Sequence, residues 1–209
     1  MSTTGRSRIV DWPDTEATLH DLCKPFLPAG RDLCPECLVV QPDQIPFPQD
    51  QLLVHHEHMT VVLEKHHGAP VEVSVLAEHL DGDFYTRKIS LAPRGSPGKV
   101  VELGIVQMDF RYMAPEVRDE ILAKQLPLGA VLIKHDVLRR IKPRWFLRFP
   151  PDGPVMGLFG PQPQPAPEPV YGRIGTIYCN EEPAIELLEI VLNCGPSGPD
   201  AGGNGERIP

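Results

Sequence analysis

The sequence has no apolar run that approaches the roughly 20 residues needed to span a bilayer. Its first twenty residues contain no apolar signal-peptide core. We therefore expect a cytoplasmic protein with no membrane span. The sequence also lacks a basic surplus, because its net charge is −8 at pH 7. Nucleic acids and anionic membranes attract basic surfaces, so the charge balance predicts neither as a partner.

Several motifs of common enzyme classes are missing as well. There is no glycine-rich phosphate loop, no Walker motif, no GxSxG elbow and no HExxH pair. These absences weaken nucleotide-binding, hydrolase and metalloprotease interpretations. The five cysteines form an odd set, and reduced thiols are the default inside cells. A disulfide framework is therefore not expected.

A zinc site is the alternative that the cysteines leave open. Cys34 and Cys37 have the spacing of half a zinc knuckle, and Cys23 is a third thiol. A fourth ligand could come from His20 or from the histidines at 55, 56 and 58. A full site normally shows a second close pair of ligands, and the sequence has none. We predict no metal and keep Cys23, Cys34 and Cys37 as the weaker alternative.

The 209 residues suit one domain, and a hydrophobic content of 41% is enough for a core. Much of the proline lies in two stretches. Residues 1–50 are rich in proline and cysteine and are expected to form an irregular arm. The sequence PQPQPAPEP at 161–169 predicts a polyproline-like surface loop inside a domain that spans residues 51–193. The tail, residues 194–209, is expected to be disordered.

Periodicity within 51–193 predicts the fold class. A helical pattern covers residues 51–67, and alternating patterns follow at 71–77 and 84–91 with a tight turn between them. Strands are also expected at 100–110, 145–149, 171–179 and 184–193, with a helix at 114–125. Hairpin-sized connections favour an α+β fold: one mostly antiparallel sheet of about six strands, with helices packed on one side.

Five segments of this domain, in order, resemble the chorismate lyase family. They are Met59-Thr60 with Leu63-Glu64, the strand 84–91 with Arg87, the stretch 125–129 with Pro127-Leu128-Gly129, Tyr171-Gly172-Arg173, and residues 182–192 with Glu189. The resemblance covers residues 51–193. It implies a chorismate lyase-like fold whose helical flaps close over a buried ligand. The same fold, in its UTRA-type form, serves as the effector-binding domain of bacterial transcription regulators, so fold alone does not decide activity.

The resemblance implies a site built on Arg87 and Glu189. Arg87 would anchor a substrate carboxylate, which a planar guanidinium matches with two parallel hydrogen bonds. From the residues alone, Arg87 could equally be an outward strand residue. Glu189 lies in an apolar run, where a carboxylate needs a partner or a raised pKa. Glu186, three residues earlier, competes for the same role, with a bulge as one explanation of the spacing.

Other positions follow from the same resemblance. Met59 and Leu128 would contribute backbone N–H groups and shape, although by themselves they look like core residues. Arg173 or Arg140 could hold a second carboxylate, and a surface or ion-paired role is as good an explanation for each.

These features lead to a functional expectation. The chain is expected to be a carbon–oxygen lyase that needs no cofactor and eliminates pyruvate from chorismate, or from a close analogue, to give 4-hydroxybenzoate. The alternative is a non-catalytic module of the same fold that binds a small aromatic acid.

Overall fold

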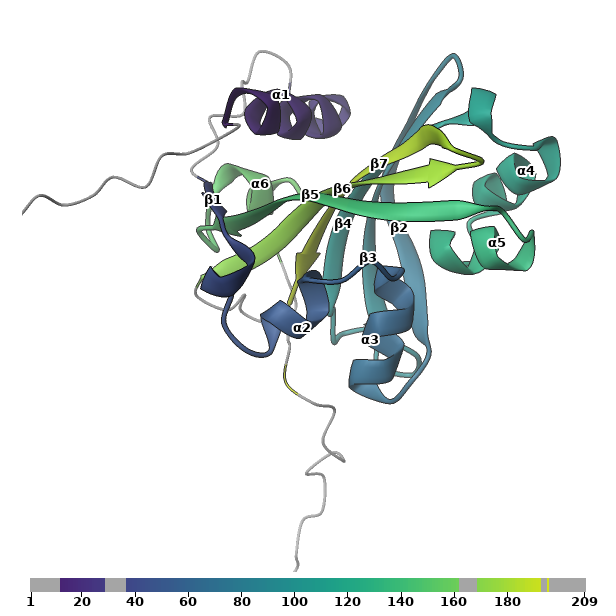
Figure 1. The fold of residues 1–209 in the computed structure, drawn as a ribbon. Coiled ribbons are helices and arrows are strands. Elements are labelled where there is room, and N and C mark those ends of the chain that lie inside the picture. Colours follow the sequence, from purple (N-terminus) through teal and green to yellow (C-terminus); the bar gives the residue numbers. More distant parts are fainter. Residues whose placement is uncertain (1–11, 29–36, 162–168, 193–194, 196–209) are drawn as a thin grey trace, which may run out of the picture.

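The computed structural model describes residues 12–28, 37–161, 169–192 and 195, and all structural statements below refer to these residues. They form one seven-stranded antiparallel sheet with the order β1-β5-β6-β7-β4-β3-β2 (Figure 1). The strands are β1 (Leu38–Val40), β2 (Val71–Asp81), β3 (Phe84–Pro93), β4 (Glu102–Asp109), β5 (Arg139–Phe149), β6 (Val170–Cys179) and β7 (Glu182–Val191). The α-helices are α1 (Trp12–Cys23), α2 (Gln49–Leu53), α3 (Met59–His67), α4 (Pro115–Ala123), α5 (Leu128–Lys134) and α6 (Pro154–Gly157), and short 3-10 turns lie at Lys24–Phe26, Pro42–Gln44 and Phe110–Tyr112.

Tight turns determine which strands pair. Gly82 and Asp83 join β2 to β3, and the glycine supplies the positive φ (58°) that a two-residue hairpin requires. Asn180 and Glu181 join β6 to β7 with φ values of 51° and 69°. Two positive φ values in succession match the right-handed twist of the paired strands. These hairpins place β2 beside β3 at one edge of the sheet and β6 beside β7 near its centre.

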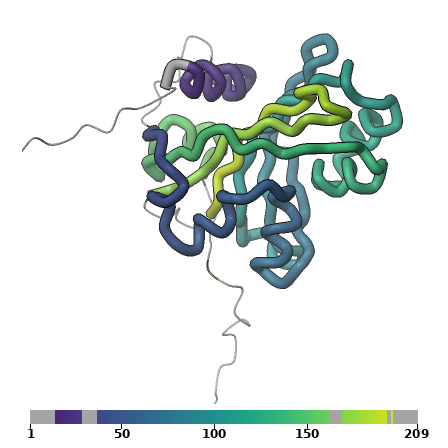
Figure 2. The backbone as a smooth tube through the Cα atoms, in the orientation of Figure 1, coloured from purple at the N-terminus to yellow at the C-terminus, as the bar shows by residue number. Residues whose placement is uncertain are grey.

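The predicted fold class, an antiparallel α+β domain, is confirmed. Helices α2 to α5 pack on one face of the sheet, where two apolar clusters lie. We call this the helical face. On the opposite face, α1 contributes Leu19, Leu22 and Cys23, and α6 contributes Val155 and Met156, to a third apolar cluster. The figures show α1 on its own side of the sheet, away from α3 and α5 (Figures 1 and 2). Among the described residues, no helix is both long and apolar enough to cross a bilayer.

Two parts of the helical face differ from the sequence prediction. The single helix expected at 51–67 is two helices, α2 and α3, separated by residues 54–58, which we call the linker (Figure 2). Helix α5 was not predicted, because its seven residues are too few for a clear helical period. Its Gly129 lies so close to α3 that a Cβ atom would come 2.8 Å from Thr60 Oγ1.

The N-terminal stretch also differs, since it is not uniformly irregular. Helix α1 has its one proline, Pro13, in the first turn, where proline is tolerated, and its Leu19, Leu22 and Cys23 are buried. Strand β1 then pairs with three residues of β5. The predicted proline-rich loop at 161–169 and the predicted tail at 194–209 lie almost wholly outside the described residues.

Candidate ligand-binding site

A group of charged side chains lies inside the helical face, where the two apolar clusters meet. It consists of Arg87 on β3, Glu102 on β4, Arg173 on β6 and Glu189 on β7, all at most 8% exposed. We call these four residues the polar seam. Strand register places them together: Arg173 lies opposite Glu189, which lies opposite Gly104, while Arg87 lies opposite Val106. Charged groups so deeply buried require partners, which makes the seam the first candidate for a functional site.

At one end of the seam, Arg173 is fully engaged. Its Nε donates a hydrogen bond to Glu189 Oε2 at 2.5 Å. Its Nη1 donates to the backbone carbonyls of Leu53 (3.0 Å) and His55 (2.9 Å), and Nη2 donates to Glu57 O at 3.5 Å. The arginine therefore pairs with a carboxylate and also holds the linker from the inside. This arrangement explains why the helical pattern breaks at residues 54–58.

Glu102 is a second acid near Arg173, which is already paired with Glu189. Its Oε2 is buried and has no hydrogen-bond partner among the described residues. Burial raises the pKa of Glu102 well above its usual value, and the negative charge of Glu189 raises it further, with Arg173 acting in the opposite direction. Because Arg173 is already paired with Glu189, the neutral carboxylic acid is the stable form of Glu102.

At the other end, Arg87 is unpaired. The residue is 0% exposed, and its Nε, Nη1 and Nη2 all lack an acceptor among the described residues. Burial lowers the pKa of Arg87, while Tyr85 and Glu78 act in the opposite direction. Glu78 lies opposite Arg87 in the register, yet its carboxylate accepts a hydrogen bond from Tyr85 Oη (2.7 Å) and pairs with Lys124. A guanidinium stays protonated at neutral pH, so the seam carries one uncompensated positive charge.

Met59 and Leu128, the two other positions expected near the ligand, flank the seam. Each is the first residue of its helix, α3 and α5 respectively, and each is nearly buried. They belong to different apolar clusters on the helical face. Their expected role, offering backbone N–H groups to a ligand, stays a prediction.

The structure separates two further candidates from the seam. Arg140 is exposed, and its guanidinium lies 4.1 Å from the ring centre of Tyr178. Glu186 bonds to Thr176 Oγ1 at 2.8 Å and pairs with Arg144 at 3.3 Å. In a regular strand, residues three apart point to opposite faces, so Glu186 lies on the other face of the sheet from Glu189. Only Glu189 of the two glutamates is in the seam.

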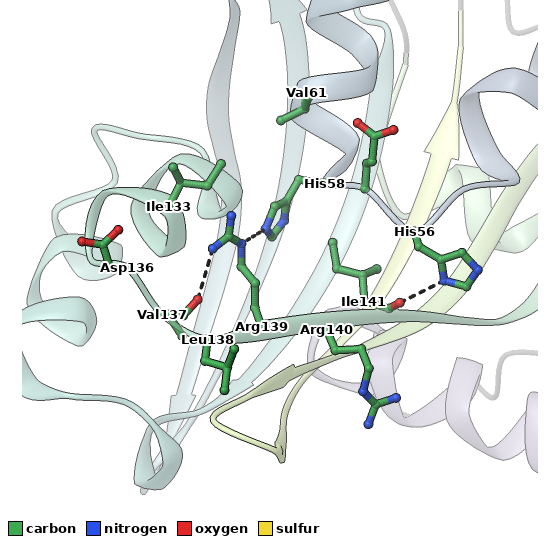
Figure 3. Close-up of a pocket in the computed structure, with 11 residues that line it drawn as sticks. His56, His58, Val61, Ile133, Asp136, Val137, Leu138, Arg139, Arg140 and Ile141 are labelled. Carbon is green, nitrogen blue, oxygen red and sulfur yellow. Dashed lines mark hydrogen bonds between the residues drawn. The ribbon is translucent and has the colours of Figure 1, made fainter.

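An open cleft of about 820 Å³ lies on the outer side of the linker (Figure 3). His58 Nε2 accepts a hydrogen bond from Arg139 Nε at 2.7 Å, and His56 Nδ1 lies 3.2 Å from Ile141 O. Figure 3 shows the side chain of Arg140 pointing away from the His58–Arg139 pair. Burial, with help from Arg139 and Arg173, lowers the pKa of His58 to about 4. The linker therefore forms the wall between this cleft and the polar seam.

Sequence reasoning missed Glu102 and the His58–Arg139 pair. A signal for Glu102 did exist, because it is the one acid within the apolar stretch Val100 to Val106. No local sequence pattern predicts the hydrogen bond between His58 and Arg139, since the two residues are 81 positions apart and come together only in the folded chain.

The cysteines considered for zinc lie elsewhere. Cys23 and Cys37 are buried in the apolar cluster beneath α1, where burial raises their thiol pKa to about 12 and about 11. Cys34 lies outside the described residues. Within the described ranges, no group of three potential ligands is positioned to hold a metal ion.

Comparisons with known proteins return no matching family model and no matching curated protein. Solved structures do match. PhnF from Mycobacterium smegmatis aligns at 14% identity with a TM-score of 0.46, over 64% of this chain and 63% of its own. Its effector domain aligns at 14% identity with a TM-score of 0.42, over 66% and 89%. A GntR-family transcriptional regulator from Bacillus cereus aligns at 10% identity with a TM-score of 0.37, over 59% and 92%. The chain thus spans less than two thirds of the full PhnF chain.

These matches correct one expectation. The structures reported above are PhnF, the effector domain of PhnF and a GntR-family transcriptional regulator, and none of them is described as a lyase. The expectation of a carbon–oxygen lyase acting on chorismate is therefore wrong.

Proposed function

We propose that this chain is a non-catalytic binding module for a small aromatic monocarboxylic acid, and that Arg87 holds the ligand's carboxylate. The observation that carries the proposal is the buried guanidinium of Arg87, whose three nitrogens lack an acceptor among the described residues. An isolated buried charge is strongly unfavourable. A carboxylate supplies both the missing charge and two well-matched acceptors.

The surroundings of Arg87 support an aromatic body for the ligand. The next residues on the same face of β3 are Tyr85 and Ile89, and Val106 lies directly opposite on β4. Tyr85 stacks on Phe110 with ring centres 5.6 Å apart. A charged group surrounded by apolar and aromatic side chains suits a ligand that is anionic at one end and apolar in the middle.

Calorimetric titration of the full chain with benzoate tests the proposal. We expect binding to the wild type and a loss of at least about a hundredfold in affinity for Arg87→Met, because the variant removes a charge-assisted pair from a buried site. Arg94→Met is the matched control, since Arg94 pairs with Glu72 at the surface and its side chain is 66% exposed. An affinity that is unchanged in Arg87→Met, or equally reduced in Arg94→Met, would remove Arg87 from the site.

A further inference from the structure

Two buried groups on the strands of the helical face lack partners among the described residues, and they are of opposite chemistry. One is the guanidinium of Arg87, and the other is Oε2 of Glu102. Val106 is the partner of Arg87 in the register, and Glu102 lies four residues before Val106 on β4. Even spacing along a strand keeps side chains on one face, so both groups rise from the same side of the sheet. At the rise of a β-strand, four residues correspond to roughly 13 Å.

On β3 and β4, the sheet surface between the two groups carries no polar side chain. Gly104 lies between Val106 and Glu102 on the same face of β4; its partner on β3 is Ile89, and its partner on β7 is Glu189, which is bonded to Arg173. A Cβ atom on Gly104 would come 3.1 Å from Ile89 Cγ1, so the side chain of Ile89 covers the glycine and keeps this strip apolar. Side chains rise roughly perpendicular to a sheet, so a separation of roughly 13 Å less two hydrogen bonds of about 3 Å each leaves roughly 7 Å, which suits a molecule with a single ring.

The charges of the seam set the chemistry at the Glu102 end. Arg173 is paired with Glu189, and Arg87 lies at the other end of the seam, so Glu102 has no unpaired cation beside it. Burial keeps Glu102 in the neutral form, as its raised pKa indicates. A neutral carboxylic acid has an O–H donor in addition to its acceptor oxygens. The seam then has one free positive charge and one free neutral donor, and a monoanion with an uncharged acceptor complements both.

We propose that Glu102 is a specificity-determining residue that donates a hydrogen bond to the far end of the ligand held by Arg87. The ligand class is a monocarboxylic acid with an uncharged hydrogen-bonding group, such as a hydroxyl or a carbonyl, opposite its carboxylate. This inference rests on the proposed function, because it takes the Arg87 end as the carboxylate site. It adds a residue for which the resemblance to chorismate lyases implies no role.

Titration of the full chain with three probes tests the inference: benzoate, 4-hydroxybenzoate and 4-(aminomethyl)benzoate. The wild type should bind 4-hydroxybenzoate about tenfold more tightly than benzoate, because only the hydroxyl satisfies Glu102. The aminomethyl probe should bind most weakly, since its ammonium would meet a neutral donor. Glu102→Gln, whose amide N–H₂ still donates, should keep the hydroxyl preference. Glu102→Leu should bind benzoate and 4-hydroxybenzoate equally.

The possible failures can be told apart. A hydroxyl preference that survives in Glu102→Leu would overturn the role of Glu102. Tightest binding of the aminomethyl probe would overturn the neutral form and assign an ionised Glu102. If the wild type binds benzoate through Arg87 but shows no hydroxyl preference, only this inference fails. If no probe binds, the proposed function fails with it. Should Glu102→Leu not fold, the ranking of the three probes by wild type and Glu102→Gln decides the question.

Discussion

Two arginines buried to the same degree, on one face of one sheet, have opposite surroundings. Arg173 is 1% exposed and bonds to a carboxylate and to three backbone carbonyls. Arg87 is 0% exposed and has no acceptor among the described residues. The first arrangement is complete within the chain, as expected of a structural ion pair. The second lacks any acceptor among the described residues, and this difference is the basis of the binding role that we propose for Arg87.

The largest expected effect on stability comes from breaking the ion pair between Arg173 and Glu189. Arg173→Met leaves Glu189 buried without its cation and releases the linker carbonyls. We expect the free energy of unfolding to fall by about 3–5 kcal/mol, the usual result of removing one partner of a buried pair. Denaturant titration measures it. Arg144→Met is the control, since Arg144 and Glu186 are partly exposed and their pair should contribute less than about 1 kcal/mol. A loss of less than about 1 kcal/mol in Arg173→Met would contradict the structural role of Arg173.

Substitution of Arg87, at the unpaired end of the seam, should change the free energy of unfolding in the opposite direction. Arg87→Met replaces an unpaired buried charge with an apolar side chain of similar length. We expect the ligand-free protein to become more stable by about 1–4 kcal/mol, or to stay unchanged. The same denaturant titration, carried out without ligand, checks this. A marked loss of stability would show that Arg87 has a partner within the chain, and the contrast with Arg173 would disappear.

Arg139 is intermediate between Arg173 and Arg87 in its pairing, because it has an acceptor, but that acceptor is the neutral imidazole of His58 and not a carboxylate. The pKa of His58 is lowered to about 4, by burial first and by Arg139 and Arg173 next. In the unfolded chain, His58 is protonated as the pH falls through about 6.5, whereas in the folded protein it is protonated only near pH 4. Stability contributed by neutral His58 is therefore present above about pH 6.5 and is lost as the pH falls, by about 1.4 kcal/mol between about pH 7.5 and 5.5.

His58→Gln measures this smallest effect, since the amide oxygen can still accept from Arg139 but does not titrate. The difference in unfolding free energy between wild type and variant should narrow as the pH falls through that window. His79→Gln, at an exposed position on β2, serves as the control and should show no such change. Parallel pH profiles of wild type and His58→Gln would mean that the pKa of the histidine is the same in the folded and the unfolded protein.

Much of the sheet could be predicted from the sequence, because its signals are local. Alternation identified β2 and β3, and the Asp81-Gly82-Asp83 turn joined them. Helix α5 was missed because a helix of seven residues hardly exceeds a short apolar run. The break between α2 and α3 was missed for a different reason: its cause, Arg173, is more than a hundred residues further along the chain.

The site was predictable only in part. Strand parity and the resemblance placed Arg87 and Glu189 in the interior, where the structure has them. Their different situations could not be read from the sequence, because the pairing of Glu189 with Arg173 depends on the register of β6 against β7. To identify Glu102 as a site residue, one needs the same strand register and also the fact that Arg173 is already paired with Glu189.

The linker has one more consequence. Arg173 donates hydrogen bonds from the interior to the linker's backbone carbonyls at residues 55 and 57. On the outside, the linker's side chains at 56 and 58 form hydrogen bonds with β5. Five residues thus have one surface toward the buried charges and the other toward solvent. The histidine-rich segment is therefore in direct contact with the buried ion pair on one side and with the cleft on the other.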